Sequence, residues 1–124
     1  MRTANEYYEQ FAYASAAKEY EYVLGKRTDR EAIINVADCY RQIGNPVKTE
    51  FWYQRALKLP NPKVEWGLFY AEALMKNGNY EMAKQSLANY INLNKTDFRA
   101  QRMLESCDSI EDFLKIPRCI QFQF

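Results

Sequence analysis

The chain has 124 residues, with 17 Lys or Arg and 16 Asp or Glu, so its net charge is +1 and no strong field is available to attract nucleic acid. It contains no histidine, the commonest general acid–base and metal ligand, and its three cysteines lack metal-binding spacing. We therefore expect no enzyme, no metal and no cofactor. The polar N-terminus lacks the apolar core of a signal peptide, and no segment approaches the ~20 apolar residues of a membrane span.

The first predicted pair of helices covers about residues 4–11 and 13–24. In its second helix the apolar residues Ala16, Tyr20 and Leu24 recur at the spacing of one helical face. Such a face is stable only when another element covers it, so we expect the next pair to pack against this one.

The second pair begins near Asp29, whose side chain can cap a helix N-terminus, and its return helix runs to about Lys58. Gly44, Asn45 and Pro46 separate the two helices. Gly and Asn tolerate left-handed backbone angles, and Pro suits the first position of a helix. This sequence therefore predicts a tight turn between two antiparallel helices.

The third pair covers about residues 63–77 and 80–93, with a turn at Asn77-Gly78-Asn79. A seventh helix is expected over about residues 97–107, followed by a short separate turn at 110–114. A terminal helix of this kind would cover the exposed side of the last pair, as stacked repeats require.

Residues 116–124 are predicted to form an extended tail. After Pro117, apolar residues alternate with Gln over positions 120–124, which is typical of a strand. We expect this strand to begin a following domain; docking onto the helices or onto another chain is the alternative. The cysteines are expected to be buried thiols, although a pairing of Cys107 with Cys119 remains open.

A repeat organises the chain, because Gly44-Asn45 recurs 34 residues later as Gly78-Asn79, and Ala37 recurs as Ala71. A period of about 20–50 residues is the mark of stacked helical or strand units. We therefore predict an all-α protein, a right-handed α-α superhelix with three helix pairs, a capping helix and an extended C-terminal tail. The solenoid is expected over 1–115, with pairs at about 4–25, 30–58 and 63–93 and the capping helix at about 97–107.

These paired helices resemble tetratricopeptide (TPR) repeats, which have small residues such as Ala37 and Ala71 where helices cross. Gly78-Asn79-Tyr80 fits the family's turn, whereas Pro46 and Thr49 depart from its usual Tyr and Ala. The resemblance implies a scaffold for protein–protein interaction. The tyrosines Tyr7, Tyr40, Tyr53, Tyr70 and Tyr90 are expected in the core.

A narrower resemblance rests on segments such as VADCYRQIGN and DFRAQRMLESCDSI. They are similar to the TPR portion of OmpA-like envelope proteins of Bacteroidetes, over residues 4 to about 110. In that family a β-propeller and a peptidoglycan-binding domain follow, and some members serve type IX secretion or gliding. The resemblance implies the N-terminal module of a larger periplasmic protein associated with the outer membrane. The alternatives are a cytosolic adaptor or co-chaperone-like protein, and a structural module that self-associates, for example through its tail.

We expect a protein or peptide segment to bind in a groove formed by the first helix of each pair, which faces inward in a solenoid. Leu68, Phe69 and Met75 would form an apolar patch with charges beside it, which suits such a partner. Alternatively, Leu68 and Phe69 pack against the capping helix or the tail and leave no groove. The predicted groove residues are Asn5, Tyr8, Ile34, Asn35, Asp38, Arg41, Gln42, Leu68, Phe69, Glu72, Met75 and Lys76.

Overall fold

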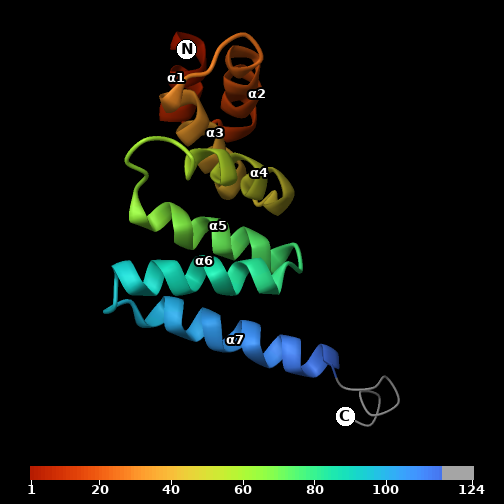
Figure 1. The fold of residues 1–124 in the computed structure, drawn as a ribbon. Coiled ribbons are helices and arrows are strands. Elements are labelled where there is room, and N and C mark those ends of the chain that lie inside the picture. Colours follow the sequence, from red (N-terminus) through yellow and green to blue (C-terminus); the bar gives the residue numbers. More distant parts are fainter. Residues whose placement is uncertain (116–124) are drawn as a thin grey trace.

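A computed structural model of the protein describes residues 1–115 and the side chains of residues 1–109. Over these residues the chain is a stack of helices in which each helix packs against its neighbours in sequence (Figure 1). The described residues contain no strand, which confirms the all-α prediction. The helices are α1 (Arg2–Glu9), α2 (Tyr13–Leu24), α3 (Arg30–Ile43), α4 (Pro46–Ala56), α5 (Val64–Lys76), α6 (Tyr80–Leu93) and α7 (Phe98–Lys115).

The predicted helix limits are correct for α2 and α6 and differ elsewhere by one or two residues, except at α7. The separate turn predicted at 110–114 is wrong, because α7 continues without interruption to Lys115. No Gly or Pro stands between Phe98 and Pro117, so nothing in the sequence stops the helix earlier. The tail predicted at 116–124, and with it any pairing of Cys119, lies outside the described residues.

In the second pair, the start of α3 and the turn between α3 and α4 have the capping contacts that the sequence predicts. The Asp29 carboxylate accepts the backbone N–H of Ala32 at 3.0 Å and so caps α3. Gly44 ends α3 in the left-handed region, with φ 85°. The Asn45 side chain then accepts the N–H of Lys48 at 3.2 Å, and Pro46 opens α4.

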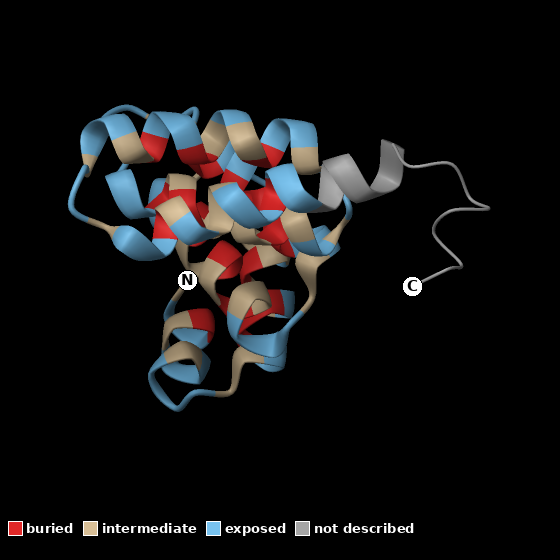
Figure 2. Ribbon diagram, turned by 90° about the horizontal axis from the view of Figure 1, so that it is seen from below, coloured by how far each residue is buried: buried red, intermediate tan, exposed pale blue. Residues whose placement is uncertain are grey.

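Small residues lie where the helices cross. Ala37 and Ala71 are both fully buried, which the stacked-pair prediction requires. Alanine at a crossing lets the backbones of two helices approach closely. Larger side chains, among them Val36, Leu74 and Leu87, fill the space on either side of these crossings. Buried residues therefore lie on the sides of the helices that face one another, and exposed residues lie outside (Figure 2).

Polar side chains tie the third pair to the second. The Glu50 carboxylate on α4 accepts the side-chain N–H groups of Asn77 and Asn79, each at 3.1 Å. Asn77 also donates to the carbonyl of Pro46 at 3.0 Å. These bonds hold the α5–α6 turn against the beginning of α4, so the turn contributes to packing between pairs as well as reversing the chain.

The turn of the first pair is built differently. Phe11 adopts a left-handed backbone conformation with φ 61°, although it has a bulky side chain, and it is 76% exposed. A residue other than Gly in this region costs about 1–2 kcal/mol. Backbone hydrogen bonds from Phe11 to Tyr8 and from Ala12 to Tyr7 hold the turn. The first pair is therefore the locally strained one.

Among the tyrosines predicted in the core, Tyr53, Tyr70 and Tyr90 are buried and Tyr40 is half-buried. Tyr7 is 36% exposed, so its placement in the core was wrong. It lies on α1, a short helix of 8 residues that packs chiefly against α2. None of the helices described here combines the length and the apolar character needed to span a membrane.

Candidate functional site

The predicted groove residues come from α1, α3 and α5, and all but one of them lie at least partly at the surface. We call the surface that these side chains form the odd-helix face. It consists of Asn5, Tyr8, Ile34, Asn35, Asp38, Arg41, Gln42, Phe69, Glu72, Met75 and Lys76.

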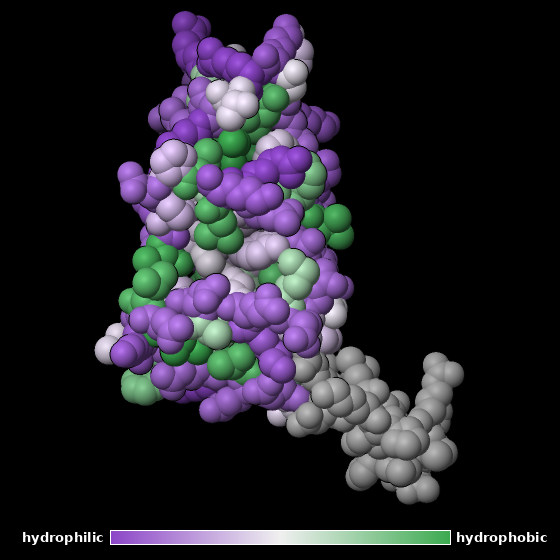
Figure 3. Space-filling view, viewed as in Figure 1, coloured by the Kyte–Doolittle hydropathy of each residue, from purple (hydrophilic) through white to green (hydrophobic). Residues whose placement is uncertain are grey.

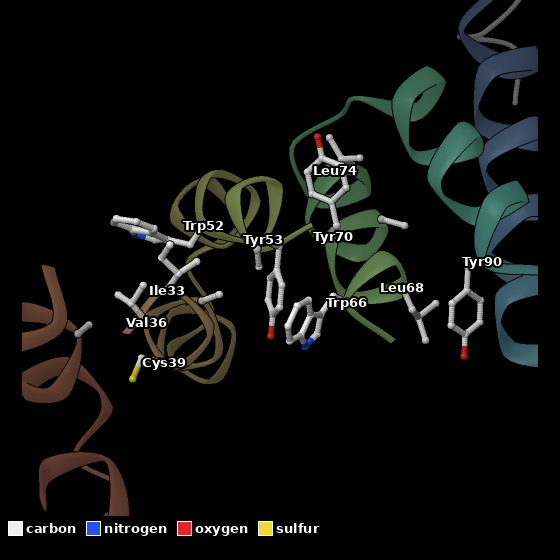
Figure 4. Packing of buried hydrophobic residues seen from close by; sticks show 14 of the residues in the cluster. Ile33, Val36, Cys39, Trp52, Tyr53, Trp66, Leu68, Tyr70, Leu74 and Tyr90 are labelled. Carbon is white, nitrogen blue, oxygen red and sulfur yellow. The ribbon is translucent and has the colours of Figure 1, made fainter. Parts of the chain in front are cut away.

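Leu68 is the exception, and its prediction as a groove residue was wrong. It is 1% exposed and belongs to the core. It lies on the side of α5 that faces Tyr90 of α6 (Figure 4). The side chain is large and apolar and sits between two helices, so it contributes to packing and offers no surface to a partner.

A line of side-chain contacts crosses the odd-helix face from α1 to α5. The Tyr8 hydroxyl donates to the Asp38 carboxylate at 2.5 Å, and Arg41 donates to the other oxygen of the same carboxylate at 2.7 Å. The guanidinium of Arg41 also lies over the ring of Phe69, 4.1 Å from its centroid. The ring of Phe69 in turn contacts that of Tyr53 on α4, with centroids 5.7 Å apart. The three helices are therefore linked through their surface side chains.

A second network lies beside this line. The buried hydroxyl of Tyr20 on α2 donates to the Asn5 side chain at 2.6 Å and accepts a hydrogen bond from the Asn35 side chain at 3.1 Å. Asn5 and Asn35 thus bind a tyrosine of their own chain. Neither amide is wholly available to a partner.

The surroundings of Tyr8, Tyr53 and Arg41 raise the pKa of each side chain. Burial and the hydrogen bond to Asp38 raise the pKa of Tyr8 above its usual value of 10.0. Burial also raises the pKa of Tyr53 to about 12, against the opposing hydrogen bond to Arg41. Burial by itself would lower the pKa of Arg41, but its hydrogen bonds to Asp38 and Tyr53 outweigh this and raise it. At neutral pH the tyrosines are protonated and Arg41 is charged.

The remaining members of the odd-helix face are available for contact. Gln42 and Lys76 are exposed, whereas Ile34, Glu72 and Met75 are half-buried. The hollow at this end of the face, between the α3–α4 turn and α5, has a volume of only about 20 Å³. That is room for about one water molecule. The face is therefore shallow at this point.

The possible metal ligands in the described part of the chain are dispersed. Across residues 1–109, no three His, Cys, Asp or Glu side chains gather closely enough to hold a metal ion. Burial raises the pKa of the Cys39 thiol to about 12, so this side chain is not a nucleophile at neutral pH.

A larger cavity, of about 440 Å³, lies away from the odd-helix face, and the sequence analysis missed it. Its residues come from α2, α3, α4 and the loops that follow α2 and α4. The available signal was the sequence of α4, where Phe51 and Trp52 are followed by Arg55 and Lys58 at helical spacing. The cavity is lined by Leu24, Thr28, Ile33, Phe51, Trp52, Arg55, Lys58 and Leu59.

No family model matches the chain, and no curated protein matches it significantly in sequence. Solved structures do match. One is the C-terminal TPR-containing domain of a protein described as an FK506-binding protein of Plasmodium falciparum, with a TM-score of 0.71. The two are 20% identical, and the match covers 93% of this chain and 88% of that one. The fold is therefore an all-α solenoid of the TPR type.

Proposed function

We propose that the protein is a module for protein–protein recognition that binds a partner segment on the odd-helix face. The observation that carries this proposal is the continuous line from Tyr8 through Asp38 and Arg41 to Phe69, which fixes surface side chains of three helices before any partner arrives. Side chains that are already ordered lose little conformational entropy on binding. The TPR-type fold, in which the first helix of each pair presents a surface for contact, supports the same proposal.

The composition of the face suggests the kind of partner. Ile34 and Met75 offer apolar contact, while Gln42, Glu72 and Lys76 add polar groups and charges of both signs. Asp38 and Arg41 neutralise each other. A strongly charged partner would gain little here, so we infer an extended or helical segment with a few apolar side chains and balanced charge.

We further propose that this module forms the N-terminal part of a larger periplasmic protein associated with the outer membrane. Support comes from the resemblance of residues 4 to about 110 to the TPR portion of OmpA-like envelope proteins. Sequencing the gene on both sides would test this context. A lipidation or secretion signal upstream and a propeller downstream are expected; a gene that encodes only these residues would contradict the proposal.

Binding on the odd-helix face can be tested by adding charge to it. The double variant Gln42→Glu, Met75→Glu places two carboxylates on the face and leaves the Arg41–Phe69 stack intact. We expect it to lose a partner captured from envelope extract by the wild-type chain. Phe69→Glu is a poorer choice, because it would also remove the contacts of that ring with Arg41 and Tyr53.

The matched control adds the same charge elsewhere. Gln85→Glu, Ala88→Glu alters two exposed positions of α6, and we expect it to retain capture. Helical content of both variants is compared by circular dichroism. Equal capture by both variants, with their helices intact, would remove the assignment of the binding face.

A further inference from the structure

The cavity of about 440 Å³ beside α4 is separate from the odd-helix face and shares no residue with it. Trp52 and Tyr53 leave α4 on different sides, and Trp52 lies beside Ile33 (Figure 4). Tyr53 contacts Phe69 of the odd-helix face, whereas Trp52 and Ile33 line the cavity. A ligand in the cavity would therefore not compete with one on the odd-helix face.

The walls of the cavity are mainly apolar. Leu24, Ile33 and Leu59 line it together with two aromatic rings. The rings of Phe51 and Trp52 meet edge to face, with centroids 4.9 Å apart, and Phe51 remains 42% exposed. On the face drawn in Figure 3, apolar residues occur in separate patches among polar ones. An exposed aromatic ring next to a cavity is a common feature of recognition sites.

The charged groups at the cavity are both cations. The guanidinium of Arg55 lies 3.7 Å from the centroid of Phe51 and 5.7 Å from that of Trp52. Among the side chains that the structure describes, neither Arg55 nor Lys58 has a carboxylate partner. No acidic residue lines the cavity. This contrasts with Arg41 on the odd-helix face, whose charge is compensated by Asp38.

The stacking of Arg55 restricts its geometry. The guanidinium lies over the ring of Phe51, and its planar set of N–H groups can donate two parallel hydrogen bonds to a carboxylate. The indole N–H of Trp52 is buried, and it has no hydrogen-bond acceptor among the described residues. A buried donor of this kind is unfavourable, so an acceptor brought near it would be stabilised.

We propose that this cavity binds a partner segment in which one large apolar side chain is flanked by carboxylates. The apolar side chain enters between Leu24, Ile33 and Trp52, and the carboxylates pair with Arg55 and Lys58. A volume of about 440 Å³ accommodates one such side chain with its immediate neighbours and is too small for the apolar face of a long helix. The partner is an acidic segment of another protein, and this contact is independent of the proposed odd-helix site.

A fluorescently labelled peptide tests the proposal on the complete 124-residue chain. The probe has one leucine flanked on each side by two glutamates, with both ends blocked. Fluorescence anisotropy is expected to show saturable binding, and the same peptide with glutamines in place of glutamates is expected to bind at least about tenfold more weakly, as charge-assisted hydrogen bonds predict. A glutamine peptide that binds equally well, or a glutamate peptide that does not bind at all, would overturn the proposal.

Variants locate the site. Arg55→Gln is expected to weaken binding at least about tenfold, and Lys58→Gln, which disturbs no ring contact, by a smaller factor. Arg102→Gln removes an exposed arginine from α7 and is the matched control, expected to leave affinity unchanged. Gln42→Glu, Met75→Glu distinguishes the two faces: if that variant and not Arg55→Gln abolishes binding, the peptide occupies the odd-helix face and the cavity assignment is wrong.

A measurement on the unaltered chain covers the case in which Arg55→Gln perturbs folding. The protein has two tryptophans, Trp52 and Trp66, which give two indole N–H signals in a nitrogen–proton correlation spectrum. Titration with the glutamate peptide is expected to shift the Trp52 signal and not that of Trp66. The reverse pattern would contradict binding in the cavity.

Discussion

The first and third helix pairs have the same architecture but are stabilised in different ways. In the third pair the turn contains Gly78 with φ 83°, and two asparagines fasten it to Glu50. In the first pair the corresponding turn contains Phe11 with φ 61°, and α1 has only 8 residues. The comparison teaches that stacking determines the fold, because the first pair keeps its shape without the favourable turn.

The first and third pairs also differ in how deeply they bury residues at corresponding repeat positions. Tyr7 and Leu74 occupy corresponding places in their repeats, yet Tyr7 is 36% exposed and Leu74 is fully buried. Leu74 lies on α5, which packs against both α4 and α6, whereas Tyr7 lies on α1, which packs chiefly against α2. The energetic weight of a repeat position therefore depends on its place in the stack.

The largest expected difference comes from truncating these two side chains. Leu74→Ala should lower the free energy of unfolding by about 2–5 kcal/mol, because it opens a cavity in the core. Tyr7→Ala should cost less than about 1 kcal/mol, since much of the side chain already contacts water. Urea unfolding followed by circular dichroism measures both. Equal losses would contradict the difference between the two pairs.

The turns should respond in opposite directions to substitution. Phe11→Gly relieves a left-handed conformation and is expected to raise the free energy of unfolding by up to about 1 kcal/mol, after the entropic cost of Gly. Gly78→Ala should lower it by about 1 kcal/mol through backbone strain alone, because an added Cβ would meet nothing within 4 Å. Thermal melting of the two variants beside the wild-type chain would show the opposite signs. A destabilised Phe11→Gly variant would mean that the ring contributes more than the strain costs.

Removing the contact between pairs should have a smaller effect. Glu50→Ala deprives Asn77 and Asn79 of their shared acceptor and should lower the free energy of unfolding by about 0.5–1.5 kcal/mol. Hydrogen exchange is expected to increase at the α5–α6 turn and not at the turn around Phe11. Glu105→Ala, at an exposed position of α7, is the matched control and should change neither quantity.

Because the protein has buried and half-buried tyrosines, we expect the free energy of unfolding to fall gradually as the pH becomes alkaline. Burial, with the hydrogen bond to Asp38, raises the pKa of Tyr8 in the folded chain, and burial raises that of Tyr20 as well. A raised pKa favours the protonated form in the folded state, so this contribution is present below pH ~10 and is lost as the pH rises further. Urea midpoints measured from pH 8 to pH 11 should therefore fall, and those of Tyr8→Phe should fall less steeply. A midpoint that is constant over this range would contradict the assigned shifts.

Much of the fold could be predicted from the sequence because the repeat interval constrains it. Ala37 and Ala71, the capped start of α3 at Asp29 and the turn at Gly78 are local signals, and the structure has each of them in the expected place. The end of α7 was also predictable, because no Gly or Pro stands between Phe98 and Pro117; the separate turn at 110–114 was assigned without a helix breaker before it.

The candidate sites were less predictable, since they depend on which neighbours cover a side chain. The repeat pattern treats Ile34 and Leu68 as equivalent, but only Leu68 is fully buried. The pairing of Arg41 with Asp38 has the i, i+3 spacing of one helix, but the contact of Arg41 with Phe69 joins two helices, and nothing in the local sequence indicates it. The cavity beside Trp52 was missed for the same reason, because its walls come from three helices.

The central claim, that partners bind on the face formed by α1, α3 and α5, is tested most directly by photo-crosslinking. A photoreactive amino acid is placed at Gln42 on this face or at Ala88 on α6, both exposed positions, and the chain is irradiated in cells that express it. The account predicts a discrete crosslinked product from position 42 and none from position 88. Crosslinking from position 88 with none from position 42 would show that partners bind elsewhere on the stack.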